Sequence, residues 1–419
     1  MRRIDCARLR QIIASPTITP GDAAILRGVA VNVLVEIVLD GREPWWRRRA
    51  CAVALEGRVT ARHAAALFEC VRDTSVTTEL RSALLVAISD PSGVLHEPLL
   101  AWLRAQDGVE QKYGFDLALL RARAMLGDLA VVPLLVTLAA DAWRHRRTLG
   151  QELLDAFITT QGLGAVLAAL GADSLATLAF HGADPARRLL GVRLFARAGA
   201  DVKPALADES VIVAQAAHEA LASSSGDDDA LWELVRQRGP GHLWALVVLH
   251  RRGHAVQAAW RDLGASIELP GVPPDVREAI VRTYAPGERE TDPRWLLEAA
   301  CLDPDGGVDE DDLLRRASEA LASAGLEPQT PVSAGEHYQQ GFGTYHTIVT
   351  LAGTVTVSTL GPFFSHEHDE PRVVAALHTA GFRSIDATLA GTVFAGLHVY
   401  FFGRRDPLAV ADLLFYWQD

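Results

Sequence analysis

The sequence predicts a mainly helical protein, with an α-solenoid over residues 1–325 followed by a small α+β domain over residues 326–419. A polar turn followed by an arginine-bearing amphipathic helix recurs along the chain, as in REPWWRRRACAVALEG from Arg42 and DPARRLLGVRLFARAG from Asp184. One such helix pair cannot bury its own apolar face, so we expect the pairs to stack on one another. After residue 325 the apolar period changes from 3.6 to 2, which is typical of strands.

The composition is that of a folded globular protein, because 49% of the 419 residues are hydrophobic and 22% are charged. The net charge of -12 argues against general binding of polyanions. The charge is uneven, since residues 1–150 hold 20 basic and 16 acidic side chains. Any anion site is therefore expected in this N-terminal third.

The sequence carries no signal that favours secretion or membrane insertion. Its N-terminus, MRRIDCARLRQ, lacks an apolar segment, and its longest apolar run covers 129–140, which is too short to span a bilayer. The four cysteines form no C-x-x-C pair that would suggest a redox or zinc site. We expect a cytoplasmic protein that has no membrane partner.

Several of the helical segments resemble HEAT repeats of the short bacterial type. The matching segments have a turn with Asp or Pro, then an apolar-rich helix, over 184–200, 208–222 (with QAAHEALA) and 274–284 (PDVREAIVRTY). The resemblance covers roughly residues 40–320, and it implies a solenoid in which the second helix of each pair lines a concave face. Proteins built from such repeats serve as scaffolds and adaptors, and some are bilin-lyase-like enzymes or DNA-repair glycosylases.

The C-terminal segment contains an internal repeat. TLAGTV occurs at 350–355 and again at 388–393, and FF follows at 363–364 and at 401–402, with the same offset of 38 residues. We interpret this as two β-hairpin–helix units (ββα-ββα) with Ala-Gly at each hairpin turn. Packed together, the units predict a four-stranded antiparallel sheet with two helices on one face.

Tryptophan and arginine occur together at the start of two predicted second helices, PWWRRR at 44–49 and AWRHRR at 142–147. Tryptophan beside arginine can stack on a base or bind a carboxylate or phosphate. The alternative is that the arginines pair with aspartates of adjacent turns and the tryptophans pack between helices. The candidate partner-binding residues are Trp45, Trp46, Arg48, Arg49, Trp143, Arg144 and Arg147.

The segment SHEHDEP at 365–371 offers His366 and His368 as candidate metal ligands. A closed site needs further ligands, which do not lie nearby in the sequence, so no metal is assigned. The alternatives are a loop that contacts a partner and a plain acidic helix start. No serine or cysteine lies in a catalytic context, so we expect no catalytic residues and no cofactor.

These observations favour a non-catalytic macromolecular binding protein, which would be an adaptor, a scaffold or an immunity-type inhibitor whose partner is another protein. The alternative is a nucleic-acid-directed HEAT-like protein, such as a DNA glycosylase-type repair enzyme, to which the WWRRR segment points. The net charge of -12 disfavours that alternative, because binding to a duplex needs many phosphate contacts.

Overall fold

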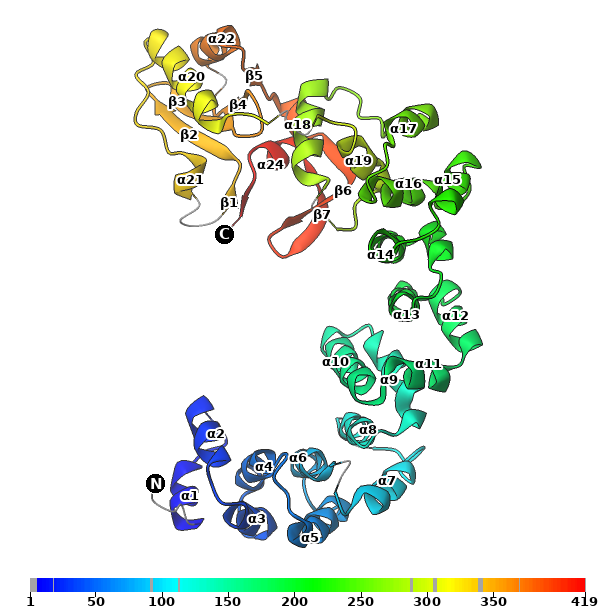
Figure 1. Ribbon diagram of the computed structural model, residues 1–419. Coiled ribbons are helices and arrows are strands. Elements are labelled where there is room, and N and C mark those ends of the chain that lie inside the picture. Colours follow the sequence, from blue (N-terminus) through cyan, green and yellow to red (C-terminus); the bar gives the residue numbers. More distant parts are fainter. Residues whose placement is uncertain are drawn as a thin grey trace. The chain divides into compact units, whose positions relative to one another are not determined.

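The computed structural model describes residues 6–17, 19–90, 93–111, 114–286, 289–303, 307–337, 342–368 and 370–418. The chain is mainly helical and carries a small sheet region near its C-terminus, which confirms the predicted fold class at that level (Figure 1). It forms two compact units, Met1–Gly191 and Val192–Asp419, which are described separately.

The first unit is helical throughout the part that the structure describes. Neighbouring helices pair as α3 with α4, α5 with α6, α7 with α8 and α9 with α10. In addition, α2, α4, α6, α8 and α10 contact one another in that order, and we call them the even-numbered row (Figure 1). The helices of this unit are α1 (Cys6–Ile12), α2 (Pro20–Arg27), α3 (Val31–Leu39), α4 (Trp45–Ala54), α5 (Ala61–Arg72), α6 (Thr78–Ile88), α7 (His96–Arg104), α8 (Phe115–Met125), η1 (Leu129–Val131), α9 (Val132–Ala139), α10 (Arg144–Gln161), α11 (Leu163–Leu170), α12 (Ala172–Phe180) and α13 (Pro185–Arg197), which continues past Gly191.

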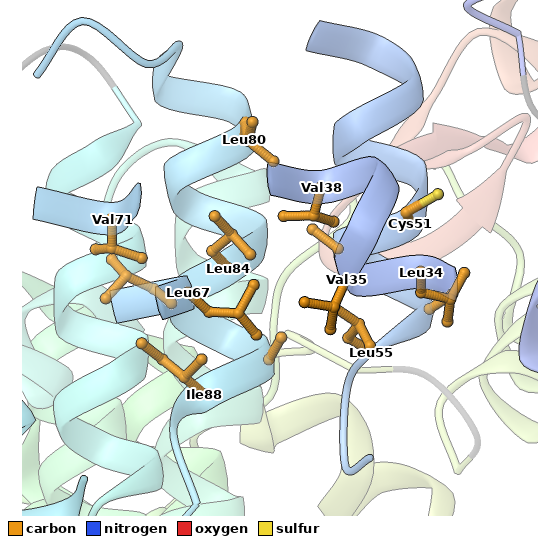
Figure 2. Packing of buried hydrophobic residues seen from close by; sticks show 14 of the residues in the cluster. Leu34, Val35, Val38, Cys51, Leu55, Leu67, Val71, Leu80, Leu84 and Ile88 are labelled. Atoms are coloured by element: carbon orange, nitrogen blue, oxygen red, sulfur yellow. The ribbon is translucent and has the colours of Figure 1, made fainter. Parts of the chain in front are cut away.

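Aliphatic side chains at helical spacing hold these pairs together. Leu34 and Val38 on α3 lie one helical turn apart, and both are fully buried. They join Leu55, at the end of α4, and Leu84 on α6 in one continuous cluster (Figure 2). Because each helix buries its face on the next pair, the core of this unit is built from contacts between neighbouring helices.

Two glycines mark close approaches between helices in this unit. A Cβ atom on Gly150 of α10 would lie 2.4 Å from the backbone nitrogen of Ala139 on α9. A Cβ atom on Gly191 of α13 would lie 2.6 Å from the Cα atom of Ala179 on α12. No side chain fits at these distances, so both helix pairs depend on glycine at these positions.

The second unit begins with helices and ends with strands. Its helices are η2 (Lys203–Ala207), α14 (Val211–Ala222), α15 (Asp228–Arg236), α16 (His242–Arg251), α17 (Gln257–Leu263), α18 (Pro274–Tyr284), α19 (Pro293–Ala299), α20 (Glu310–Ser323), α21 (Ala334–His337), α22 (Pro371–Thr379), α23 (Ala387–Ala390) and α24 (Val410–Leu414). Its strands are β1 (Phe342–Gly343), β2 (Tyr345–Thr350), β3 (Gly353–Ser358), β4 (Phe363–His366), β5 (Arg383–Ser384), β6 (Val393–Phe401), β7 (Arg404–Ala409) and β8 (Trp417–Gln418).

A four-stranded sheet does form, but its composition differs from the prediction. Its order is β2-β3-β4-β5, and β4 pairs with β5 in parallel, so the sheet is not wholly antiparallel. β6 and β7 form a separate hairpin, and β1 pairs with β8. The apolar face of the sheet packs in one cluster with α20 and α22, whereas β6, β7 and α24 share another cluster with α18 and α19.

The two TLAGTV copies adopt different structures, so the predicted ββα-ββα duplication is wrong in detail. In the first copy Leu351 and Ala352 form the β2–β3 turn, and the Thr350 hydroxyl stabilises it by donating to Gly353 O over 2.9 Å. In the second copy Thr388, Leu389 and Ala390 lie in α23, because the Asp386 carboxylate caps this helix, and Val393 begins β6. The second hairpin turns instead at Phe402 and Gly403, both at positive φ.

Both clusters of the second unit take residues from the two sides of the boundary predicted after residue 325. Leu313 and Leu321 of α20 pack with Ile348 and Phe364 of the sheet. Trp295 of α19 packs with strand residues of the β6–β7 hairpin. The packing therefore does not divide the chain at residue 325, and α18, α19 and α20 are part of the structure that carries the strands.

Candidate functional site

The first tryptophan–arginine segment begins α4, and its side chains point in different directions. Trp45 is 44% exposed, while Trp46 is half-buried, packs against the core cluster and lies under the Arg47 guanidinium, which is 4.8 Å from the ring centre. Arg48 is half-buried and Arg49 is exposed. Trp45 and Arg49 are four residues apart, so they share one face of the helix.

Arg48 is occupied by the backbone of the preceding helix. Its Nε donates to Val38 O at 2.7 Å, and a second nitrogen lies 3.5 Å from Cys70 Sγ. Val38 is in the last turn of α3, where carbonyl groups have no partner within their own helix. A guanidinium at this end satisfies such a carbonyl and also complements the helix dipole.

The same use of arginine recurs along the first unit. Arg81 Nε donates to Val71 O at 2.7 Å, as Arg48 does to Val38. Arg147 donates to Asp141 O at 2.8 Å, and Arg188 donates to Gly182 O at 2.7 Å. The arginines that recur in the sequence therefore chiefly donate hydrogen bonds to backbone carbonyls of the segment that precedes each helix. Arg48 and Arg147 belong to this set.

The second tryptophan–arginine segment leaves its first residues in solvent. Trp143 is the N-cap of α10 and is 64% exposed, with its ring edge-to-face against His145 at 5.7 Å. Arg144 is exposed, whereas the neighbouring Arg146 pairs with Asp141 at 3.1 Å. The exposed members of the seven candidates are thus Trp45, Arg49, Trp143 and Arg144.

A cavity of about 440 Å³ runs along four helices of the even-numbered row. Of the seven candidates it includes only Arg49, so the structure does not bring the two tryptophan–arginine segments together at this cavity. Val53 lines it beside Arg49, although Val53 is 52% exposed. The lining comes from α4 (Arg49, Val53), the turn after it (Glu56), α6 (Thr78, Glu79, Ser82, Ala83, Val86), the start and middle of α8 (Gly114, Leu117, Ala118, Arg121) and α10 (Leu149).

A second cavity, of about 580 Å³, lies between α2 and α4. Arg49, Val53 and Glu56 line both cavities, so the two share one wall made by α4 and the turn after it. The α2 side contributes Ala23, Leu26 and Arg27. Sequence reasoning missed these residues, although the spacing of Trp45, Arg49 and Val53 at every fourth position was a signal for one solvent-facing stripe on α4.

The charges around the start of α4 form a buried network on the side away from Arg49. Glu43 is buried and pairs with Arg10 and with Arg47, the latter at 2.6 Å. Burial raises the pKa of Glu43, but its hydrogen bonds with Arg47 and Arg10 outweigh burial and hold the pKa below its usual value. This network fixes the turn before α4, while Arg121 and Glu56, 3.7 Å apart, form a loose pair at the cavity.

The first histidine of the SHEHDEP segment serves the local fold, whereas the side chain of His368 is exposed. His366 is buried, and its Nδ1 accepts from the backbone nitrogens of His368 and Glu370, at 3.4 and 3.2 Å. Among the described residues, no group of three or more His, Cys, Asp or Glu side chains could hold a metal ion. Asp369, a further member of the segment, lies outside the described residues.

In the same described part of the chain, no single helix is long and apolar enough to cross a membrane. The pair α10 and α11 meets the length and composition test only when the two are counted together, and the chain bends by 113° between them.

Comparison with family models, with curated proteins and with solved structures finds no significant match to this chain. The resemblance to HEAT repeats therefore stays a prediction, and the argument for function depends on the site itself.

Proposed function

We propose that this protein is a non-catalytic macromolecular binding protein, and that it binds another protein along the even-numbered row of a HEAT-like solenoid. Adaptor, scaffold and immunity-type inhibitor are the forms that such a protein takes. The observation that carries the proposal is the cavity lined by α4, α6, α8 and α10 in succession. A hollow built from equivalent positions of successive helix pairs suits an extended partner surface.

The chemistry of the lining supports a protein partner. Val53 is 52% exposed, and Val86, Leu117 and Leu149 are half-buried. Apolar side chains with charged residues at the border are typical of a protein interface. A nucleic-acid partner is the second candidate that the sequence suggests, but Glu56 and Glu79 balance Arg49 and Arg121 in the lining, which leaves no excess of positive charge for a phosphate backbone.

The test is capture of partners from the native host's lysate on the full-length tagged protein after nuclease treatment. Val53→Asp changes the cavity, and Val109→Asp is the matched control, because Val109 is 53% exposed and lines neither cavity. The expected result is one stoichiometric protein that wild type and Val109→Asp retain and that Val53→Asp loses. Equal capture by both variants would overturn the proposal, and loss of every partner after nuclease would favour the nucleic-acid alternative.

A further inference from the structure

The cavity between α2 and α4 has a floor made of small apolar residues. Ala23 and Leu26 contribute from α2, and Ala50, Val53 and Ala54 contribute from α4. Alanine is too short to fill the space between two helices, which leaves the hollow of about 580 Å³. A floor of this kind accepts an apolar side chain from outside and removes its surface from water.

The walls of this cavity are held in place by Arg58. Its guanidinium donates to Ala54 O, at the end of α4, at 3.1 Å. The same group donates to Leu26 O at 3.5 Å, and to Val29 O, at and just after the end of α2. One side chain therefore joins the C-terminal ends of both helices, so the spacing between α2 and α4 is set before anything binds.

Two further arginines border the same cavity, and their charges are not used within the fold. Arg27 and Arg49 are both exposed, and neither makes a hydrogen bond or ion pair with the residues that the structure describes. The one acidic side chain of the lining, Glu56, lies 3.7 Å from Arg121. A guanidinium on an apolar surface favours a carboxylate, which its paired N–H groups fit in geometry.

We propose that this cavity binds an acidic amphipathic segment of the partner protein, with an apolar side chain in the alanine-lined floor and a neighbouring Asp or Glu side chain on Arg27 and Arg49. This inference rests on the proposed function and names the chemistry of the partner. A carboxylate carried on an amphipathic segment is favoured over a nucleic-acid phosphate because the floor is apolar and can bury the segment's apolar side chain. Burial of the segment's apolar side chain supplies binding free energy, and its acidic side chain orients the segment on the two arginines.

The experiment measures binding of two fluorescent amphipathic peptides to the full-length protein. Both peptides carry the same leucine pattern, one with glutamates and the other with lysines on the polar face. The glutamate peptide is expected to bind roughly tenfold or more tightly, and added salt is expected to weaken it. Equal affinity for the two peptides, or preference for the lysine peptide, would overturn the proposal.

Three variants locate the binding within the protein. The double variant Arg27→Ala/Arg49→Ala is expected to lose most of the preference for the glutamate peptide. Ala23→Leu fills the floor without changing charge and is expected to weaken both peptides. Arg42→Ala is the control, because Arg42 is exposed and lies outside the linings of both cavities, so its affinities are expected to match wild type. Circular dichroism establishes that each variant is folded.

The two proposals fail in different ways. If the peptides show no preference while Val53→Asp still abolishes partner capture, the even-numbered row binds a protein but the acidic segment is wrong. If the glutamate peptide binds at Arg27 and Arg49 while Val53→Asp, which changes both linings, leaves partner capture unchanged, the cavity binds acidic segments but the proposed interface along the even-numbered row is wrong. Displacement of the glutamate peptide by short DNA with higher affinity would overturn the acidic-protein assignment in favour of a nucleic acid.

Discussion

The starts of α4 and α10 carry the same kinds of side chain but use them over different spacings. Arg48 reaches back ten residues to Val38 O, whereas Arg147 reaches back six residues to Asp141 O. Three residues after each arginine lies a buried position, which is Cys51 in α4 and Gly150 in α10. The comparison teaches that the arginine anchors each helix, while the residue three positions later sets how closely its neighbour approaches.

The largest effect is expected when α10 is given a side chain at position 150, as α4 has at the equivalent position, Cys51. Gly150→Ala places a Cβ atom 2.4 Å from the backbone of α9, which is too short for any contact, so the two helices must separate. We expect a loss of about 3 kcal/mol in the free energy of unfolding. Denaturant unfolding followed by circular dichroism measures it.

Gly164→Ala in α11 is the matched control for that substitution. No atom lies within 4 Å of the position of its Cβ atom, and alanine is the better helix former. This variant is expected to unfold at the same or slightly higher denaturant concentration than wild type. If both glycine variants behave alike, the close approach of α9 and α10 does not set the stability of this pair.

The turns before the two helices differ in how deeply they bury an acid. Glu43 is buried against Arg47 and Arg10 before α4, while Asp141, at the matching turn before α10, has a side chain that is 24% exposed. Glu43→Gln removes a charge that two guanidinium groups share, and at neutral pH it is expected to cost about 2 kcal/mol. Asp141→Asn is expected to cost less, because the ion pair between Asp141 and Arg146 is partly exposed and water already solvates both charges.

The cost of Glu43→Gln depends on pH in a defined direction. The pKa of Glu43 in the folded protein lies below its usual value of 4.5. Its ionised form therefore stabilises the fold above that value, and this contribution is lost as the pH falls through the folded-state pKa. The unfolding free energies of wild type and Glu43→Gln are expected to differ at neutral pH and to converge in acid, and a constant difference would contradict the role of the charge.

The anchoring arginines give the next largest effect. Arg48→Ala leaves the helix-end carbonyl of Val38 without its donor, Arg147→Ala does the same to the turn carbonyl of Asp141, and each is expected to cost about 1–2 kcal/mol. Arg48→Lys keeps the charge but not the directed N–H group, so it is expected to recover only part of the stability. Thermal unfolding of the three variants checks this, and full recovery by lysine would mean that charge alone is sufficient.

The sequence predicts the mainly helical fold because apolar residues recur at helical spacing and several helices begin at a polar or proline-bearing turn, as α2, α6, α18 and α20 do. It fails at the TLAGTV repeat because the structure there is decided by the residues that precede the six letters. The first copy follows a run of β-branched residues, Thr347 to Val349, which favours a strand and hence a hairpin. The second copy follows Asp386, whose carboxylate accepts from the backbone nitrogens of Thr388 and Leu389 at 2.9 Å and so starts a helix. The same six-residue sequence therefore adopts different structures, depending on the residues that precede it.

At the candidate site the sequence points to α4 and α10, which both line the first cavity, but not to the side of each helix that faces solvent. Arg47, Arg48 and Arg49 are equivalent by composition, yet one pairs with Glu43, one with a carbonyl, and one lines both cavities. Consecutive helical residues point about 100° apart, so their roles separate only when the neighbouring helices are placed. The contribution of Arg27 depends on how α2 folds against α4, which no local pattern encodes.

The smallest expected effects come from the arginines that face solvent, and they sharpen the comparison most directly. Arg49→Ala and Arg144→Ala remove no contact that holds the helices, so each is expected to change the unfolding free energy by no more than about 0.5 kcal/mol. They differ in position, because Arg49 lines both cavities and Arg144 lines neither. If capture of the partner falls with Arg49→Ala and not with Arg144→Ala, at equal stability, then the start of α4 takes part in binding and the start of α10 is structural. If Arg144→Ala lowers capture as much, the contact surface extends beyond the two cavities, and exposed Trp143 becomes its next candidate.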